Sequence, residues 1–159
     1  MDIKIKSEEG QFKFRVCGIV EKDNKFLVMK MNENKFYCLP GGHVELGEDT
    51  QTAVLREMKE ELGYEVEVKK LLCVHQNMFK TAEGKPFHEL GFYYLVKPTI
   101  ANLSTENHFR TENDKGEIKT HEFRWVTKDE LKKLDFRPEI IRETILNDTE
   151  NFECYITKE

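Results

Sequence analysis

The chain has 159 residues, and its 25 Lys and Arg against 30 Asp and Glu give a formal net charge of −5 at pH 7. This length predicts a single domain over residues 1–159 that folds without a disulfide or metal staple. The acidic balance disfavours duplex DNA as a partner, because its phosphates select a basic protein face. The sequence has no apolar run of the roughly 18 residues that a membrane span requires, and its first ten residues lack the apolar core of a signal peptide. We therefore expect a cytoplasmic protein that is not bound to a membrane.

Strand patterns dominate the first forty residues. Residues 2–6 alternate polar and apolar side chains, as a short edge strand does. The apolar runs 12–20 and 25–31 flank an Asp-Asn turn signal at 23–24, and together they predict a hairpin. Residues 36–39 predict a further short strand, which ends at the Pro-Gly-Gly sequence that follows it.

A helix is predicted from residue 49 or 50 to residue 62, because N-cap residue types precede it and Gly63 follows its last turn. Apolar residues recur along this helix at i, i+4 and i+8, which predicts the face that packs on a core: Val54, Met58 and Leu62. Segments 64–74 and 89–96 predict strands. A change of phase at 69–70 indicates a bulge in the first of them.

The last third of the chain combines a long polar segment with two more helices. Residues 98–120 are polar and nearly without pattern, which predicts a loop that is either a lid over a bound ligand or a surface insertion. Residues 123–126 predict a strand. The capping-box spacing at 127–130 predicts a short helix through Leu134, and Pro138 suits the first turn of a last helix.

Together these elements predict an α+β fold class, with helices on both faces of a mixed β-sheet. The loop 98–120 and the C-terminal tail 147–159 would be peripheral segments. The four cysteines show neither CxxC spacing nor paired histidines nearby, so we expect free thiols rather than zinc ligands or disulfides.

The clearest chemical signal lies on the first predicted helix. At 100° per residue, Glu57, Glu60 and Glu61 fall within an arc of about 100° beside the apolar stripe. An ordinary solvated face is one interpretation, in which Arg56 and Glu60 form an i, i+4 ion pair. A bound cation is the other, because Glu57 and Glu61 repel each other at the same spacing and Glu48 adds an acid at the helix entrance. Clustered carboxylate oxygens favour Mg²⁺ or Mn²⁺ over zinc.

The spacing of residues 42–64 resembles the Nudix box, the signature of Nudix hydrolases. The segment reads Gly42, five residues, Glu48, seven residues, and then Arg56-Glu57-Met58-Lys59-Glu60-Glu61-Leu62-Gly63-Tyr64. Every fixed glycine, glutamate and arginine of the pattern is present, whereas Met58 and Tyr64 stand where the family usually has aliphatic residues. Outside this box, the predicted hairpin, the sequence Leu39-Pro40-Gly41-Gly42 and the strand 123–126 match the family only in general pattern.

The resemblance implies an αβα sandwich around a mixed β-sheet, the Nudix fold. It also implies divalent-metal-dependent hydrolysis of a pyrophosphate bond in a nucleoside diphosphate linked to another group, and it makes a homodimer one expectation. Carried over by position, the metal ligands would be Glu57, Glu60, Glu61 and the carbonyl of Gly41. Glu57 would alternatively act as the base that activates water. Arg56 and Glu48 would orient the carboxylates.

Outside the box, the sequence leaves several roles open. Glu122, directly before the strand 123–126, and Glu117 are candidates for a catalytic base or an extra metal ligand, or else they are exposed loop acids. Arg15 and Lys30 lie on strands that would flank the site. They are candidates for binding the substrate phosphates, or else they are surface charges.

The leading hypothesis is a Mg²⁺- or Mn²⁺-dependent pyrophosphohydrolase that acts on a nucleoside triphosphate, a dinucleoside polyphosphate, a nucleotide sugar or capped RNA. Residues 77–80 lack the proline expected of the ADP-ribose subgroup, which disfavours ADP-ribose. One alternative is a Nudix-fold nucleotide-binding or regulatory module without turnover, although the complete set of box acids argues against it. The other alternative is an unrelated protein with an acidic helix, but the glycines at both ends of the box argue against it.

Overall fold

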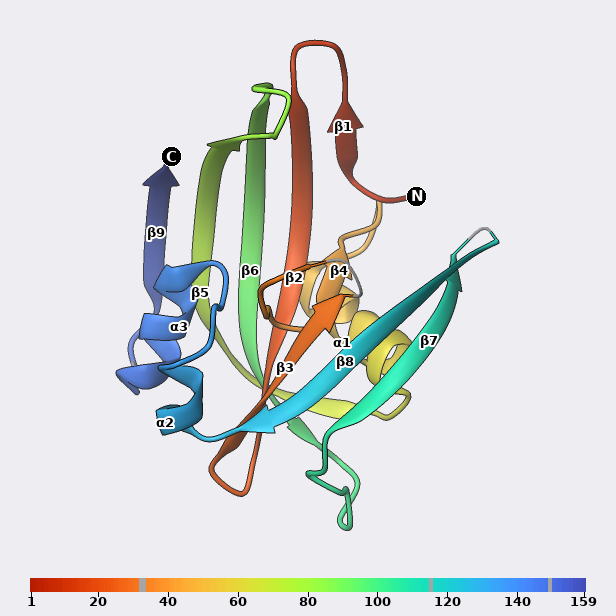
Figure 1. Ribbon diagram of the computed structural model, residues 1–159, viewed down its shortest axis with the longest axis vertical. Coiled ribbons are helices and arrows are strands. Elements are labelled where there is room, and N and C mark those ends of the chain that lie inside the picture. Colours follow the sequence, from red (N-terminus) through yellow and green to blue (C-terminus); the bar gives the residue numbers. More distant parts are fainter. Residues whose placement is uncertain (32–33, 115, 149) are drawn as a thin grey trace.

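The computed structural model describes residues 1–31, 34–114, 116–148 and 150–159. Figure 1 shows that strands make up most of the regular structure and that three helices are inserted between them. In chain order they are β1 (Lys4–Lys6), β2 (Gln11–Lys22), β3 (Lys25–Met31), β4 (Gly41–His43), α1 (Thr50–Leu62), β5 (Val66–Lys80), β6 (Pro86–Pro98), β7 (His108–Asp114), β8 (Glu117–Val126), α2 (Lys128–Leu131), α3 (Glu139–Leu146) and β9 (Glu153–Lys158).

The described strands form one mixed sheet in the order β7-β8-β3-β2-β6-β5-β9, with β1 and β4 both paired to β2. The pairs β2–β6 and β5–β9 are parallel, and the other pairs are antiparallel. In Figure 1, α1 lies behind this sheet, whereas α2 and α3 lie in front of it. The architecture is the predicted αβα arrangement, and the α+β fold class is confirmed.

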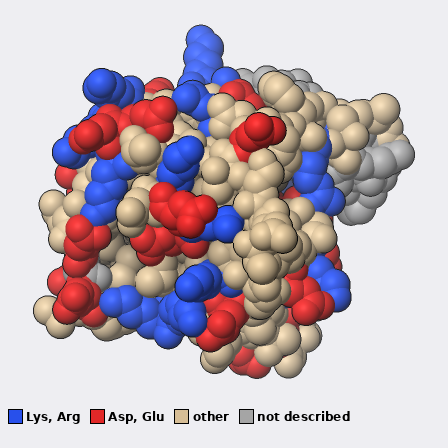
Figure 2. Space-filling model, turned by 90° about the horizontal axis from the view of Figure 1, so that it is seen from below, with Lys and Arg blue, Asp and Glu red and all other residues tan. Residues whose placement is uncertain are grey.

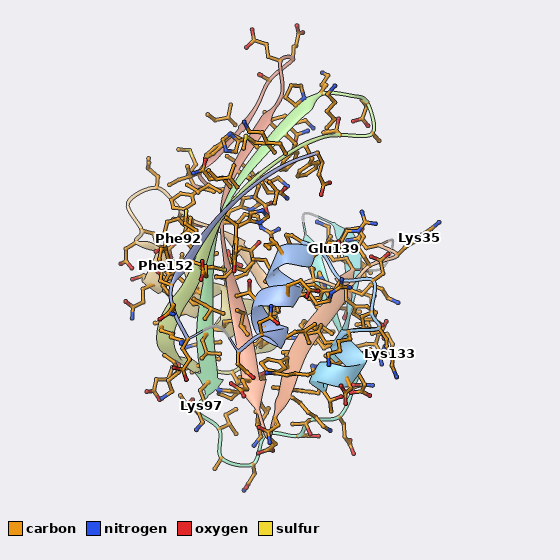
Figure 3. All side chains as sticks on the ribbon, turned by 90° about the vertical axis from the view of Figure 1, so that its left-hand side faces the viewer. Lys35, Phe92, Lys97, Lys133, Glu139 and Phe152 are labelled. Carbon is orange, nitrogen blue, oxygen red and sulfur yellow. The ribbon has the colours of Figure 1, made fainter. Side chains whose placement is uncertain are left out.

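Each face of the sheet carries its own core. The predicted stripe of α1 is buried against one face together with β-strand residues such as Val16. The other face is covered by α2, α3 and the segment between them through buried apolar side chains: Leu131, Phe136, Ile141 and Ile145. Figure 3 shows side chains filling the space between α3 and the sheet. Burial of each large apolar side chain stabilises the fold by roughly 1.5–3 kcal/mol.

The strands of the β2–β3 hairpin separate away from their turn, which leaves space beside β2 for β4. Asp23 and Asn24 have φ values of 52° and 58°, the left-handed conformation that a two-residue hairpin turn of this kind requires. β2 and β3 are paired only next to the turn, at Glu21 and Lys22. Farther from the turn the two strands separate, and β3 pairs with β8 on its other side. The segment that follows β3 fills the gap, because β4 pairs with β2. The strand predicted at 36–39 is therefore wrong in position, since residues 37 and 38 form only isolated bridges.

Helix α1 begins and ends where the sequence predicts. The Asp49 side chain accepts hydrogen bonds from the backbone N–H groups of Gln51 and Thr52, both at 2.9 Å. At the other end, Gly63 adopts the left-handed conformation (φ 79°), and its N–H donates to the carbonyl of Lys59. Both ends thus have partners for backbone groups that a helix leaves unpaired.

Three further local predictions agree with the structure, although α2 ends at Leu131 instead of at the predicted Leu134. The register of β5 shifts between Val68 and Lys70, which confirms the bulge. The capping box of Thr127 and Glu130 is formed at α2, and Pro138 is the residue before the first turn of α3.

The segment 98–120, predicted to be a loop, and the tail 147–159, predicted to be peripheral, both contain strands. Residues 98–120 contain β7 and the start of β8, which form a two-stranded ribbon at the edge of the sheet. Polar residues dominate this ribbon, so it shows no alternation, and its order comes from the pairing of β8 with β3. The tail 147–159 contains β9, which pairs in parallel with β5 and packs Tyr155 against the α3 core. A parallel pair depends on the crossover that precedes it, which a local pattern cannot reveal.

The surface carries both signs of charge. Figure 2 shows the end of the molecule with the β2–β3 turn, where Lys and Arg side chains are interspersed with Asp and Glu. A hollow of about 540 Å³ at this end is lined by charges of both signs, among them Glu21, Lys22, Lys69 and Lys97. The four cysteines are free, as expected. Among the residues that the structure describes, no helix is long and apolar enough to cross a membrane.

Candidate active site

Arg56 ties the loop before α1 to the acidic side of that helix. Its Nε and Nη2 donate to the two carboxylate oxygens of Glu48, both at 2.9 Å. Nη2 also donates to the carbonyl of His43 at 2.9 Å, and Nη1 donates to Oε1 of Glu57 at 2.8 Å. The hydrogen bond from Arg56 holds the pKa of Glu48 below its ordinary value, so Glu48 is a carboxylate at neutral pH. The structure thus brings Arg56 and Glu48 together with the first of the helix acids.

The Glu57 carboxylate is enclosed between Arg56 and Gly42. Its side chain is 13% exposed, and burial raises its pKa although Arg56 donates to it. A Cβ at position 42 would lie 2.2 Å from Oε2 and 2.3 Å from Oε1 of Glu57. Only glycine therefore leaves room for this carboxylate. A buried carboxylate whose proton affinity is raised is a group that a nearby cation stabilises in its charged form.

Glu61 and Gly41 connect the helix to β4. The N–H of Gly41 donates to Oε2 of Glu61 at 2.7 Å. A Cβ at position 41 would lie 2.1 Å from the carbonyl oxygen of Val16, so glycine is needed for the close approach of β4 to β2. Glu60 differs from the other two acids, because its side chain is 62% exposed and touches Arg56 only at 3.4 Å.

The chemistry of these donors fits a hard divalent cation. The three helix carboxylates and the Gly41 carbonyl are oxygen donors, which Mg²⁺ and Mn²⁺ prefer, and Gly42 leaves the Glu57 carboxylate free of any covering side chain at that position. In the described ranges, no three His, Cys, Asp or Glu side chains are grouped closely enough to ligate one ion together. Oxygens of Glu57 and Glu61 instead accept hydrogen bonds from Arg56 and from the N–H of Gly41.

Arg15 of β2 lies beside the Gly41 carbonyl, on the side of the sheet that faces α3. Its Nη2 donates to that carbonyl at 3.2 Å, and its Nη1 lies 3.6 Å from Oε2 of Glu89 on β6. Its Nε is buried and has no hydrogen-bond partner within the described part of the chain. The structure therefore places Arg15 next to Gly41, with its Nε–H group available to donate a hydrogen bond.

Glu122 and Lys30 form an ion pair. Glu122 lies within β8 rather than before a strand, which corrects the sequence prediction, and it is paired in register with Lys30 of β3. Lys30 Nζ lies 3.0 Å from Oε2, and the hydroxyl of Tyr37 donates to Oε1 at 2.9 Å. Burial favours the neutral acid, but the hydrogen bonds from Lys30 and Tyr37 hold the pKa of Glu122 below its ordinary value. The structure thus pairs Glu122 with Lys30 rather than with the acids of α1. The Glu117 side chain lies outside the described residues.

A cavity of about 90 Å³ separates α1 from the β7–β8 ribbon. Its lining combines two of the helix acids with polar and aromatic residues of the ribbon: Glu60, Glu61, Arg110, Thr111, His121 and Phe123. Arg110 and Tyr37 were not singled out from the sequence. A single Arg within a polar segment and a single Tyr before Pro-Gly-Gly carry no local signal, because their roles depend on residues far away along the chain.

Comparison with known proteins identifies the family. A family model described as "NUDIX domain" matches residues 11–146. The chain belongs to the Nudix family. The "ADP-ribose pyrophosphatase" of Methanocaldococcus jannaschii is 47% identical over 84 residues, which are 51% of this chain and 48% of that protein. The "Nucleoside triphosphatase NudI" of Enterobacter sp. (strain 638) is 27% identical over 128 residues, which are 76% of this chain and 85% of that protein.

The fold of this Nudix protein also matches solved structures. The crystal structure of a Nudix hydrolase from Nitrosomonas europaea matches with a TM-score of 0.65 and 20% sequence identity. The match covers 92% of this chain and 79% of that chain. The matched part of this chain spans only about half the length of the M. jannaschii relative. The Nudix box identified from residue spacing is thus confirmed by family and by fold, with α1 as the Nudix helix.

Proposed function

We propose that this Nudix protein hydrolyses a pyrophosphate bond in a nucleoside diphosphate linked to another group, with Mg²⁺ or Mn²⁺ as cofactor. The observation that carries the proposal is the Arg56 network, in which one guanidinium holds both Glu48 and Glu57 at 2.8–2.9 Å. Such an arrangement fixes carboxylate positions and is unnecessary on an ordinary solvated helix face. A bound divalent ion would supply charge neutralisation at the phosphate oxygens and would acidify the attacking water.

Glu57, Glu60, Glu61 and the Gly41 carbonyl would hold the ion in this proposal. Arg56 and Glu48 would orient Glu57 without touching the substrate. Glu57 would alternatively act as the base, and Glu60, Glu61 and the Gly41 carbonyl would then hold the ion. Burial raises the pKa of Glu57, whereas the partners of Glu122 lower the pKa of that group, so Glu57 is the favoured candidate of the two.

Arg15 is the stronger of the two candidate phosphate ligands. It lies next to Gly41 and has a buried N–H without a partner among the described residues, whereas Lys30 is already paired with Glu122. A guanidinium can bind phosphate oxygens through two N–H groups at once. We therefore expect Arg15→Lys to raise the KM for a nucleotide substrate more than it lowers kcat.

The names of the relatives make two substrate classes the first to test. One relative is named an ADP-ribose pyrophosphatase and another a nucleoside triphosphatase. The missing proline at 77–80 disfavours ADP-ribose, but the 47% identity to the first relative brings ADP-ribose back into the proposal. Both classes contain a nucleoside attached to a pyrophosphate bond, which is the group that the proposed site would cleave.

The test is a substrate panel with product identification. Wild-type protein and Glu61→Gln would be incubated with ADP-ribose, nucleoside triphosphates, dinucleoside polyphosphates, nucleotide sugars and capped RNA, with Mg²⁺ or with EDTA, and the products separated by chromatography. We expect a nucleotide product that needs both the metal and Glu61. Tight nucleotide binding without any product would instead support a binding module, which contradicts the proposal.

A further inference from the structure

Arg110 of β7 joins the ribbon to the C-terminal end of the Nudix helix. Its Nη1 donates to the backbone carbonyl of Glu61 at 2.5 Å. This carbonyl belongs to the last turn of α1, where a helix lacks N–H groups of its own to pair with the carbonyls. A guanidinium at that end also opposes the negative end of the helix dipole. Arg110 therefore stabilises the turn that carries Glu60 and Glu61.

The Arg110 guanidinium packs against Gly63. A Cβ at position 63 would lie 2.9 Å from Nη1 and 3.4 Å from Cζ of Arg110. Gly63 thus serves two purposes, because its φ of 79° also lets the chain leave the helix in the left-handed conformation. The guanidinium thus occupies the space that a side chain at position 63 would take.

The residues just before Arg110 contact the core of the protein. The ring of His108 stacks on Phe123, with centroids 5.1 Å apart and planes 10° apart. Just before β7, the side chain of Asn107 accepts a hydrogen bond from the N–H of Trp125 at 3.2 Å. Phe123 and Trp125 are both buried in the α1 core. Two residues close to Arg110 along the chain therefore contact the buried core that packs on α1.

From these contacts we propose that Arg110 is a positioning residue of the site. It fixes the last turn of α1, so that Glu60 and Glu61 present their carboxylates along the cavity wall in one arrangement. Arg110 lies outside the Nudix box, on the segment 98–120 that the sequence predicts to be either a lid or a surface insertion. The consequence for metal binding rests on the function proposed above, whereas the effect on the helix does not.

The test compares Arg110→Ala and Arg110→Lys with Phe109→Ala as a matched control. Phe109 precedes Arg110, is 71% exposed and points to the opposite face of the ribbon. The measurements are hydrogen exchange of the backbone amides in the last turn of α1, the Kd for Mn²⁺, and kcat and KM. We expect Arg110→Ala to speed exchange in that turn, to weaken Mn²⁺ binding about tenfold, and to lower kcat with little change in KM. Arg110→Lys should fall between, and Phe109→Ala should match wild type.

Unchanged exchange and unchanged Mn²⁺ affinity in Arg110→Ala, while the wild type binds Mn²⁺ and turns over substrate, would overturn this inference and leave the proposed function intact. A wild type that binds no Mn²⁺ and hydrolyses nothing would overturn the proposed function. Hydrogen exchange would still decide whether Arg110 holds the helix end.

A double-mutant cycle with Gly63→Ala gives an independent check. In the wild-type background, the added methyl group both strains the backbone and displaces the guanidinium. In the Arg110→Ala background, only the strain remains. We expect Gly63→Ala to weaken Mn²⁺ binding several-fold more when Arg110 is present. Additive effects would contradict the contact on which the inference rests.

Discussion

Gly42→Ala tests whether the position of the Glu57 carboxylate determines activity, separately from the stability of the fold. Ordinary van der Waals contacts of a Cβ begin at 3.4 Å, and the new methyl group would lie 2.2–2.3 Å from the Glu57 carboxylate. The carboxylate must therefore move by about 1 Å, a displacement that can cost about 100-fold in rate. Overpacking of this kind also destabilises a fold by about 1–3 kcal/mol.

Gly18→Ala is the matched control. Its Cβ would lie 2.5 Å from the sulfur of Met58, the residue next to Glu57 on the same helix. Met58 is a flexible apolar side chain, so this variant adds the same methyl group against α1 without touching the carboxylate. Urea unfolding, the Kd for Mn²⁺ and kcat would be measured for both variants.

We expect both alanine variants to lose stability but only Gly42→Ala to lose about two orders of magnitude in kcat. Wild-type kcat and Mn²⁺ affinity in Gly42→Ala would refute the reasoning. Equal losses of activity in both variants would also refute it, because they would show a general effect of overpacking.

Three further predictions concern the charges of the Nudix helix. Glu60→Gln and Glu61→Gln should each lower turnover by orders of magnitude with little change in unfolding temperature, since they remove charge but not volume; a wild-type rate in either would show that it is not a ligand. Arg56→Lys keeps the charge but cannot hold Glu48 and Glu57 together, so activity should fall and excess Mg²⁺ should restore it only in part; complete restoration would indicate a purely electrostatic role. Burial raises the pKa of Glu57 in the folded state, so ionisation costs stability as pH rises above the ordinary value of 4.5. In EDTA, Glu57→Gln should therefore raise the free energy of unfolding at pH 7 and raise it less at pH 5, and urea titrations that show no gain at pH 7 would contradict this.

The parts of the site that could be predicted from the sequence are those encoded within one short segment. Helical periodicity alone places Glu57, Glu60 and Glu61 beside the apolar stripe, and capping residues define both ends of α1. Arg56 and Glu48 lie eight residues apart, and their contact follows from the same loop and helix. Local patterns therefore predicted the helix and its acidic face, whereas the interpretation of that face as a metal site came from the resemblance to the Nudix box.

The parts that could not be predicted depend on long-range pairing. Arg110 meets Glu61 across 49 positions of the chain, and Tyr37 meets Glu122 across 85. Strand β9 acquires its place only because α3 returns the chain beside β5. The β7–β8 ribbon is polar, so neither alternation nor apolar content marks it as a sheet edge. Each of these features is specified by its partner rather than by its own sequence.

The most direct test of the central claim is the rate of nucleoside monophosphate formation as a function of Mg²⁺ concentration, for wild type, Glu60→Gln and Glu61→Gln. Any substrate accepted in the panel can be used. The proposed function predicts saturable dependence on Mg²⁺ in the wild type, no product in EDTA, and rates lower by orders of magnitude in both variants. Hydrolysis that persists in EDTA, or that proceeds equally in all three proteins, would contradict it.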